Sequence, residues 1–323
     1  MKSNVYAAAI AALATSALAA PALGDALPSW AAGENRDAII AFVESVTAEG
    51  TQTYLDPEDR IAVFDNDGTL WTEKPTYTEV IFAFEQVKAL APDHPEWKEQ
   101  EPFSLILENG LGALKEIGLN GAIDALTAVY AELDDAQFAA RAADFLDDPH
   151  LSAGRTYAAT TYAPMVEMVD YLRDNGFEIF IVSGGTNDFL RTFAETAYGV
   201  PPHQIVGSVL ETEVMLDETG VSLKRLPQLA YFNDGPTKVL NIVQRLGTRP
   251  TIVVGNSDGD LPMIRYALQG EGPRLAVLVN HDDDAREAAY DRGAVDAIAA
   301  AAPDGDNFIL VSMKNDFAEI WKP

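Results

Sequence analysis

Residues 60–69 read Arg-Ile-Ala-Val-Phe-Asp-Asn-Asp-Gly-Thr, and no other segment is as informative about the architecture of the chain. The apolar run before Asp65, with its β-branched members, is typical of a strand that a parallel sheet buries on both faces. Asp65 and Asp67 follow at once, so both carboxylates leave the end of the same strand. Gly68 gives the backbone the freedom to turn there. The stretch therefore predicts a buried strand with a pair of acidic side chains at its carboxyl end.

Strand-like and helical patterns alternate along most of the chain after this point. Apolar runs predict strands at 177–182, 206–214, 221–223, 251–254, 275–279 and 308–311. Helical spacing of apolar residues predicts helices at 37–46, 165–172, 189–198, 238–246, 261–268 and 284–290, and a short one at the C-terminus. The strands at 206–214 and 221–223 are expected to form a hairpin. The alternation predicts an α/β fold with a doubly wound, mainly parallel sheet and a site at the carboxyl ends of its strands.

Residues 76–148 interrupt that alternation. Helical spacing predicts helices at 80–90, 103–117, 122–133 and 135–146, with no convincing strand between them. A helical block between two strands of one sheet is best interpreted as an inserted subdomain. We therefore divide the chain into a core of residues 25–75 and 149–323 and a helical insertion of residues 76–148.

The composition narrows the possible partners. The 323 residues suit one large α/β domain with an insertion. With 50 acidic and 22 basic residues, the formal net charge is −28, which argues against nucleic acid and anionic membranes as partners. An anionic substrate would need local cations or a metal ion, because distant charge is screened beyond about 10 Å at 0.1 M salt. The absence of cysteine excludes disulfides, a thiolate nucleophile and a cysteine-type zinc site.

The N-terminus predicts export. Lys2 precedes an apolar, alanine-rich run over 5–20, and small residues at 17, 19, 22 and 24 offer cleavage sites. The run is short for a membrane anchor, so residues 1–24 are interpreted as a removable signal peptide. A helical or disordered tail is the alternative. We expect a mature protein that is periplasmic or secreted and has no membrane association.

The acidic pair at 65 and 67 suits phosphoryl transfer, which needs a nucleophile, positive charge on the phosphoryl oxygens and an acid for the leaving alkoxide. Asp65 can be the nucleophile and a metal ligand, and Asp67 a general acid and then a base. The alternative is that residues 65–68 form only a solvent-exposed turn. An EF-hand loop would need Gly at its sixth position and Glu at its twelfth. Leu70 and Thr76 occupy those positions, so the calcium interpretation fails.

Three further groups of polar residues follow other predicted strands or open a helix. A hydroxyl and flexible glycine amides at Ser183, Gly184 and Gly185 can form an anion nest, although such a triplet alone is more often a plain turn. Lys238 opens a predicted helix and can neutralise a phosphoryl group, with Lys224 and Arg225 as competitors. After the strand at 251–254, the polar residues Asn256, Asp258 and Asp260 offer hard oxygen ligands for Mg²⁺.

In this order, these segments resemble the four motifs of the haloacid dehalogenase superfamily, whose phosphatases carry Asp-x-Asp-Gly-Thr after the first strand. The resemblance implies an aspartyl-phosphate on Asp65, general acid–base chemistry at Asp67 and charge neutralisation by Lys238. It implies a phosphate site at Thr69, Ser183, Gly184 and Gly185, and Mg²⁺ ligands at Asp65, Asp67, Asn256 and Asp260. Asn256 departs from the family pattern, which has Asp there, so whether Asn256 or Asp258 contacts the metal stays open. The insertion of residues 76–148 resembles the cap that covers the site in this family.

The resemblance also bears on the substrate. Asp67 favours phosphate chemistry, since dehalogenases lack this second acid, and nothing singles out Lys88, Lys98 or Lys115 as a phosphonatase lysine. The cap position and the hairpin are similar to the phosphoserine phosphatase branch, but its substrate-binding Glu is replaced here by Lys74. We therefore expect a phosphomonoesterase of moderate or broad range that acts on small phosphate esters. Candidate substrate contacts are Glu73, Lys74, Tyr77 and Glu79.

Two alternatives stay open. One is an exported phosphatase specific for phosphoserine or phosphorylcholine, with Trp71, Tyr77 and Phe84 as candidate contacts to a quaternary ammonium group. The other is a haloacid dehalogenase fold that binds ligands but has lost turnover, which Asn256 suggests. The four histidines, at 94, 150, 203 and 281, show no metal-type spacing and are expected to be structural or exposed.

Overall fold

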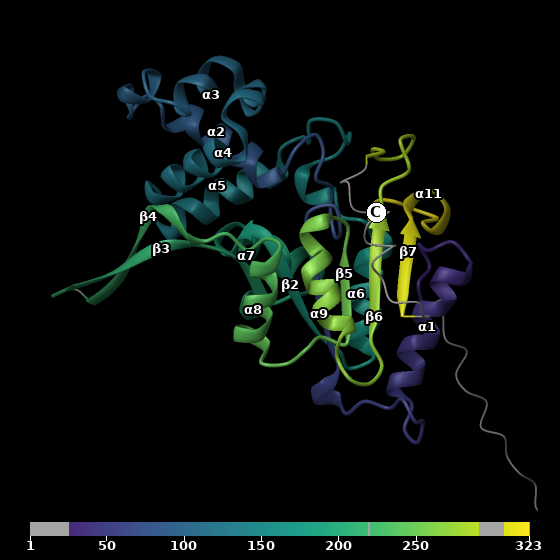
Figure 1. Cartoon of the computed structure of the whole chain (residues 1–323). Coiled ribbons are helices and arrows are strands. Elements are labelled where there is room, and N and C mark those ends of the chain that lie inside the picture. Colours follow the sequence, from purple (N-terminus) through teal and green to yellow (C-terminus); the bar gives the residue numbers. More distant parts are fainter. Residues whose placement is uncertain (1–25, 219, 291–306, 323) are drawn as a thin grey trace, which may run out of the picture.

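The fold is described from a computed structural model of the chain, covering residues 26–218, 220–290 and 307–322 (Figure 1). The predicted signal peptide of residues 1–24 lies outside the described residues. Among those residues, no helix combines the length and the apolar character that a bilayer crossing requires.

A seven-stranded sheet with the order β4-β3-β2-β1-β5-β6-β7 forms the centre of the described structure. Every neighbouring pair is parallel except the antiparallel β3–β4 hairpin. The strands are β1 Ile61–Phe64, β2 Glu178–Thr186, β3 Ile205–Asp217, β4 Gly220–Tyr231, β5 Ile252–Gly255, β6 Leu275–Asn280 and β7 Phe308–Ser312. The predicted doubly wound, mainly parallel α/β fold is confirmed.

Helices cover both faces of this sheet. In order they are α1 Glu34–Thr47, α2 Thr78–Leu90, α3 Phe103–Asn109, α4 Leu114–Ala131, α5 Asp135–Asp147, α6 Ala163–Asp174, α7 Asn187–Tyr198, α8 Pro236–Leu246, α9 Leu261–Leu268 and α11 Met313–Asp316. Successive side chains of a strand point to opposite faces. Ala62 and Phe64 accordingly join the core with α1, α6 and α7, and Val63 joins the core with α8 and α9. The continuous apolar run of β1 is explained by this burial on both sides.

The register of β1 brings three strand ends together. Phe64 pairs with Ile181 of β2 and with Val254 of β5. The residues that follow these positions therefore emerge at one edge of the sheet. That edge is where open parallel sheets place their sites.

Helices α2 to α5 gather beyond this edge of the sheet (Figure 1). Phe82 of α2 packs against Phe138 and Phe145 of α5, and also against Phe189 of α7 in the core, with 5.3 Å between the ring centroids of Phe82 and Phe189. Residues of the α2–α5 region thus share one apolar cluster with the core below them. From here on, "cap" denotes residues 76–148.

Two details of the cap differ from the sequence prediction. The helix expected over 103–117 is divided into α3, a 3₁₀ turn at Gly110–Ala113 and the first turn of α4. The break expected between 117 and 122 is a kink inside α4, where Gly118 has φ 61° and ψ −167°. A positive φ of this size favours glycine.

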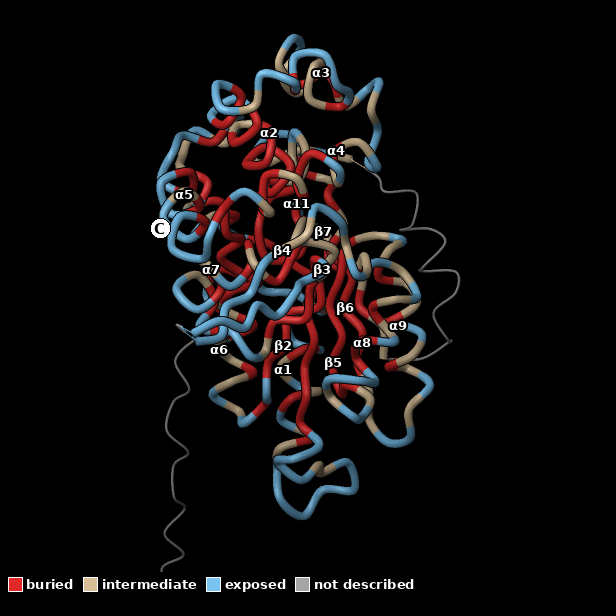
Figure 2. The backbone as a smooth tube through the Cα atoms, turned by 90° about the vertical axis from the view of Figure 1, so that its left-hand side faces the viewer, coloured by how far each residue is buried: buried red, intermediate tan, exposed pale blue. Residues whose placement is uncertain are grey.

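The hairpin is longer than predicted, and its far half is exposed (Figure 2). Val214 faces Leu223 and Leu216 faces Val221 in the hairpin register, so four aliphatic side chains share one face of the tip.

The helix expected over 284–290 is wrong, since this segment forms a turn and irregular backbone. The Asp283 carboxylate accepts hydrogen bonds from the backbone N–H groups of Ala285 and Arg286. The Arg286 guanidinium donates to the carbonyls of Met313 and Phe317 near the C-terminus. Side-chain partners of this kind compete with helical backbone pairing.

Candidate active site

A cavity of about 160 Å³ lies between the strand ends and the cap. Asp65, Asp67, Ser183 and Lys238 line it from the core, and residues of α2 and α4 line it from the cap. The geometry therefore brings together four residues that the sequence placed in one site. They come from the ends of β1 and β2 and from the first turn of α8.

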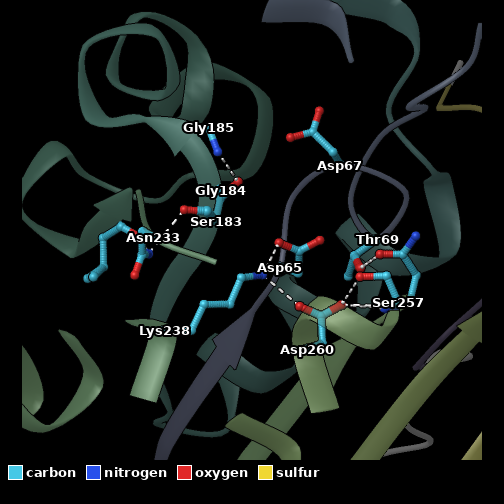
Figure 3. A network of polar contacts seen from close by, with 12 residues as sticks. Asp65, Asp67, Thr69, Ser183, Gly184, Gly185, Asn233, Lys238, Ser257 and Asp260 are labelled. Atoms are coloured by element: carbon cyan, nitrogen blue, oxygen red, sulfur yellow. Dashed lines mark hydrogen bonds and ion pairs between the residues drawn. The ribbon is translucent and has the colours of Figure 1, made fainter. Parts of the chain in front are cut away.

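Lys238 connects two carboxylates at the bottom of this cavity (Figure 3). Its Nζ lies 2.6 Å from Oδ1 of Asp65 and 2.6 Å from Oδ1 of Asp260. Burial alone would lower the pKa of Lys238, but the two negative charges and their hydrogen bonds hold it above its usual range. The competing candidates are elsewhere: Lys224 is exposed, and Arg225 pairs with Asp188 and Asp135.

Asp65 is buried, and its N–H donates to the Val254 carbonyl at 2.9 Å. Burial and the nearby charge of Asp260 raise its pKa well above the usual range, against the opposing effect of Lys238. One ammonium thus serves two buried carboxylates. A further cation bound here would lower the pKa of Asp65 and favour its ionised form.

Asp260 organises the loop that follows β5. Its Oδ2 accepts hydrogen bonds from the backbone N–H groups of Asn256, at 2.9 Å, and Ser257, at 3.0 Å. Gly255 has no Cβ, and a Cβ there would lie 2.6 Å from the Asp260 side chain. Asp260 therefore fixes both the loop and, through Oδ1, the Lys238 ammonium.

Asp67 sits apart from this pair and points away from Asp65 (Figure 3). The Trp71 indole N–H donates to its Oδ1 at 2.9 Å. Burial raises the pKa of Asp67 to about 6, which suits a group that both donates and accepts a proton near neutral pH. In this arrangement the Asp67 carboxylate is available for acid–base chemistry and does not meet the predicted metal ligands Asp65 and Asp260.

The predicted phosphate nest lies at the end of β2. The Ser183 hydroxyl accepts a hydrogen bond from the Gly185 N–H at 3.1 Å, and Gly184 and Gly185 both line the cavity. Thr69 does not line it, because its hydroxyl donates to Oδ1 of Asn256 at 3.2 Å. The structure therefore brings Ser183 and the two glycines to the site but leaves Thr69 behind it.

Asn233 is a positioning residue that the sequence analysis did not single out. Its side-chain amide donates to the carbonyls of Ser183 and Val206, at 3.0 and 2.7 Å, and so links β2 to β3 (Figure 3). Its Oδ1 accepts from Asn241 of α8 at 2.8 Å. The sequence offered one sign of this role, which is that Asn233 is a polar residue between the predicted hairpin and the helix that carries Lys238.

A second network of hydrogen bonds holds the Asp67–Gly68 turn in place. Nε2 of His281 lies 2.7 Å from the Gly68 carbonyl, and Nδ1 lies 3.3 Å from Glu287. Glu287 in turn accepts hydrogen bonds from Thr72, at 2.8 Å, and Tyr162, at 3.2 Å. His281 and Glu287 are both buried side chains, in agreement with the structural role expected for this histidine.

The donor set fits Mg²⁺. Asp65, Asn256 and Asp260 offer hard oxygen atoms around the loop after β5, and Mg²⁺ in proteins commonly keeps several water ligands beside one or two carboxylates. The buried Nδ2 of Asn256 has no hydrogen-bond partner. The Thr69 hydroxyl can donate or accept a hydrogen bond. If the Asn256 amide is rotated by 180°, Nδ2 donates to Thr69 and Oδ1 takes the position that has no partner. Within the described residues, no three histidine or acidic side chains form a complete metal cluster on their own.

Gly68 is required by this arrangement. It has φ +79°, and a Cβ at this position would lie 2.1 Å from Nδ2 of Asn256. The turn after Asp67 and the loop after β5 can pack closely only because this side chain is missing.

The candidate substrate residues separate into two groups. Glu73, Tyr77 and Glu79 line the cavity. Lys74 does not, because its ammonium lies over the ring of Tyr290, 3.9 Å from the centroid. The three lysines of the cap, Lys88, Lys98 and Lys115, are also absent from the described lining.

Two aromatic residues considered for a quaternary ammonium site are packed elsewhere. Trp71 is buried and stacks on Phe193, with centroids 4.4 Å apart, and Phe84 is buried in the apolar cluster of the cap and core. Tyr77 lines the cavity without them. No aromatic cage is formed by this set.

Glu79 of α2 joins the cap to the phosphate nest. Its Oε2 accepts from the Thr186 N–H at 2.9 Å, and its Oε1 accepts from the hydroxyls of Thr186, at 2.5 Å, and Tyr130, at 2.6 Å. Burial raises the pKa of Glu79 to about 7. A cap carboxylate therefore holds Thr186, the residue that follows Gly185 and caps the N-terminus of α7.

The sequence of the chain matches that of a known family. The sequence model of the haloacid dehalogenase-like hydrolase family matches residues 62–265, and the chain belongs to that family. The match covers the residues from β1 to α9 and so includes all four predicted motifs. The predicted membership of the haloacid dehalogenase superfamily is confirmed.

Two solved structures with TM-scores above 0.5 show the same fold at low sequence identity. A conserved protein of unknown function from Anaerococcus prevotii is 16% identical, with a TM-score of 0.52 over 86% of this chain and 91% of that chain. A protein of unknown function from Bordetella pertussis is 15% identical, with a TM-score of 0.51 over 78% and 97%. A phosphoserine phosphohydrolase-like protein from Francisella tularensis is 15% identical, with a TM-score of 0.37 over 75% and 98%. No curated protein sequence matches the chain.

Proposed function

We propose that this protein is an exported, Mg²⁺-dependent phosphomonoesterase that hydrolyses small phosphate esters through an aspartyl-phosphate on Asp65. The observation that carries the proposal is the position of the Asp65 carboxylate, which lines the cavity and shares the Lys238 ammonium with Asp260 at 2.6 Å. A buried nucleophile beside a fixed cation is what phosphoryl transfer requires. The alanine-rich segment of residues 1–24 supports export, and phosphate scavenging is then the simplest use.

In the first half-reaction, a carboxylate oxygen of Asp65 attacks the phosphorus. The new P–O bond forms as the bond to the alcohol oxygen breaks, and the Asp67 carboxyl gives its proton to that leaving oxygen. The N–H groups of the nest, the Ser183 hydroxyl and Lys238 stabilise the charge on the phosphoryl oxygens. The phosphoryl group is then esterified to Asp65.

In the second half-reaction, Asp67 is a carboxylate and takes a proton from a water molecule. The water oxygen attacks the phosphorus, the bond to Asp65 breaks and inorganic phosphate leaves. Both aspartates return to their starting states. Mg²⁺ bound at Asp65, Asn256 and Asp260 would supply further positive charge to the phosphoryl oxygens.

Hydrolysis of p-nitrophenyl phosphate, measured with Mg²⁺ and with a chelator, tests this proposal. We expect turnover with Mg²⁺ and its loss with the chelator. Asp65→Asn should form no phosphoenzyme. Asp67→Asn should release a burst of one equivalent of p-nitrophenolate, since this leaving group needs no proton, and then accumulate phosphoenzyme detectable by mass spectrometry.

Asp93→Asn is the matched control, because Asp93 is an exposed cap residue away from the cavity, and it should behave as the wild type. Equal, mild losses from the changes at 65 and 67 would contradict the assigned roles. Pure protein without metal-dependent turnover would instead support the ligand-binding alternative, in which the family fold is retained without catalysis.

A further inference from the structure

The cavity has two chemically different halves, and the half that faces the leaving group points to a substrate class. The inference rests on the proposed function. The core half carries the charged and hydroxyl groups described above. The other half is formed by α2, α4 and the end of the hairpin, and its apolar lining consists of Tyr77, Val80, Leu119, Ile123, Leu126 and Leu229.

Helix α4 presents an apolar stripe to the cavity in addition to the one that it buries in the cap. Ala122, Ala125 and Val129 are fully buried and belong to the cap core. Leu119 and Ile123 lie on a different face of α4 and line the cavity, and Leu119 is 49% exposed. Leu119 lines the cavity together with several other apolar side chains, and apolar surface gathered in one groove indicates ligand contact.

The kink at Gly118 begins this stripe. The backbone there leaves the helical conformation, with φ 61° and ψ −167°, and α4 resumes with Leu119. A Cβ at Gly118 would meet nothing within 4 Å, so the glycine is explained by its backbone angles and not by crowding. The direction in which Leu119 and Ile123 face is therefore set by a specific break in the helix.

Phe232 extends the apolar surface to the phosphate nest. A Cβ at Gly184 would lie 3.7 Å from its ring. The phenyl group thus lies beside the position proposed for the phosphoryl group. An alcohol bound to that phosphorus would lie between this ring and the α4 stripe.

Charge in the cavity is distributed unevenly. Among the described residues that line it, Lys238 is the one cationic side chain, and it is already paired with Asp65 and Asp260. The other charged side chains in this lining are all carboxylates, from Glu79 of the cap and from Asp65, Asp67, Glu73, Asp234 and Asp258 of the core. A second anionic group on the substrate would lose water and meet negative charge, at a cost in free energy that no described neighbour offsets.

We propose that the natural substrate is a phosphate monoester of an apolar alcohol or phenol that carries no second anionic group. The Leu119–Ile123 face of α4 selects the alcohol by apolar contact. Bisphosphates, phosphorylated carboxylic acids and nucleotides with several phosphates are excluded by charge.

A pair of substrates of matched shape tests the selection. We expect kcat/KM for phenyl phosphate to exceed that for 4-carboxyphenyl phosphate by about fivefold or more, since one unit-charge interaction at about 4 Å across water has this effect. Both esters have an aryl leaving group, and a Hammett correction from their non-enzymatic hydrolysis removes the electronic difference. Equal or inverted values after this correction would overturn the proposal.

Leu119→Arg tests the place of selection. An arginine there should raise the ratio of kcat/KM for 4-carboxyphenyl phosphate to that for phenyl phosphate by about fivefold. Leu216→Arg is the matched control, because it makes the same change at a 75% exposed position on the hairpin tip, and it should leave the ratio unchanged.

The outcomes separate this inference from the proposed function. If neither ester is hydrolysed with Mg²⁺, the phosphatase proposal fails and the inference fails with it. If both are hydrolysed but the carboxylated ester is preferred, or if the two arginine variants change the ratio equally, the phosphatase stands and the inference is overturned.

Discussion

The two sides of the cavity differ in how they are built. The core side consists of charged and polar groups held by short contacts to the sheet, such as the 2.6 Å bonds of Lys238 and the hydrogen bonds of Asn233 to β2 and β3. The cap side is mainly apolar, with side chains from α2 and from the kinked helix α4, and Glu79 is its one lining carboxylate among the described residues. We infer that separate parts of this chain supply reactivity and selectivity. Three predictions test that division.

The largest effect is expected from Lys238→Met, which breaks the core side. The loss of this cation should lower kcat by about 10²–10³-fold, as the loss of one fixed electrostatic contact to a transition state does. It also leaves Asp65 and Asp260 as unpaired buried carboxylates, which should cost about 3–5 kcal/mol of stability. Urea denaturation with a chelator present measures this loss.

The loss should shrink as the pH falls, because carboxylates without a cation take up protons more readily. Lys224→Met, at an exposed position on the hairpin, is the control and should change neither quantity. A stability loss in Lys238→Met that does not depend on pH would contradict the charge explanation.

Glu79→Gln tests the contact that joins the two sides. The pKa of Glu79 is raised from 4.5 to about 7, so the folded state binds its proton more tightly than the unfolded state. Its contribution to stability is complete below pH 4.5 and falls by about 3 kcal/mol as the pH rises to about 7. The variant should lack this fall, as urea denaturation across the same pH range would show.

The control for this change is Glu116→Gln, which removes an exposed carboxylate from α4. It should keep the pH dependence of the wild type. Parallel curves for Glu79→Gln and the wild type would mean that Glu79 does not titrate in this range.

The smallest effect is expected from His281→Gln, which weakens the support below the Asp67–Gly68 turn. The loss of the imidazole beside Glu287 should cost about 2 kcal/mol, the range for hydrogen bonds to charged groups. As a positioning change, it should lower kcat more than it alters KM. His203→Gln, at an exposed histidine, is the control. An unchanged kcat would limit His281 to a role in stability.

The core side was largely predictable from the sequence. Buried parallel strands leave continuous apolar runs, and the polar residues after such runs must meet at one sheet edge. Asp65 and Ser183 could therefore be placed together without coordinates, and the resemblance to the haloacid dehalogenase superfamily added Lys238. The prediction that Lys74 contacts the substrate was wrong, because Lys74 lies over the ring of Tyr290. Tyr290 belongs to a segment that the local sequence pattern assigned to a helix.

The remaining features depend on contacts between distant residues. His281 reaches the carbonyl of Gly68 across 213 positions, and no local pattern records such a contact. Asn233 likewise gains its role from strands that meet only in the folded sheet. The sequence could not show that Leu119 and Ile123 line a cavity, because apolar residues that line a cavity and apolar residues that pack in a core have the same helical spacing.

Asp260 holds the N–H groups of the loop after β5 with one oxygen and the Lys238 ammonium with the other. A single side chain thereby immobilises a backbone turn and a flexible lysine when the chain folds. The entropy loss of ordering these groups is incurred once, during folding, and is not repeated each time a substrate arrives. Molecules of this protein should accordingly meet their ligand with the catalytic lysine already locked in one rotamer.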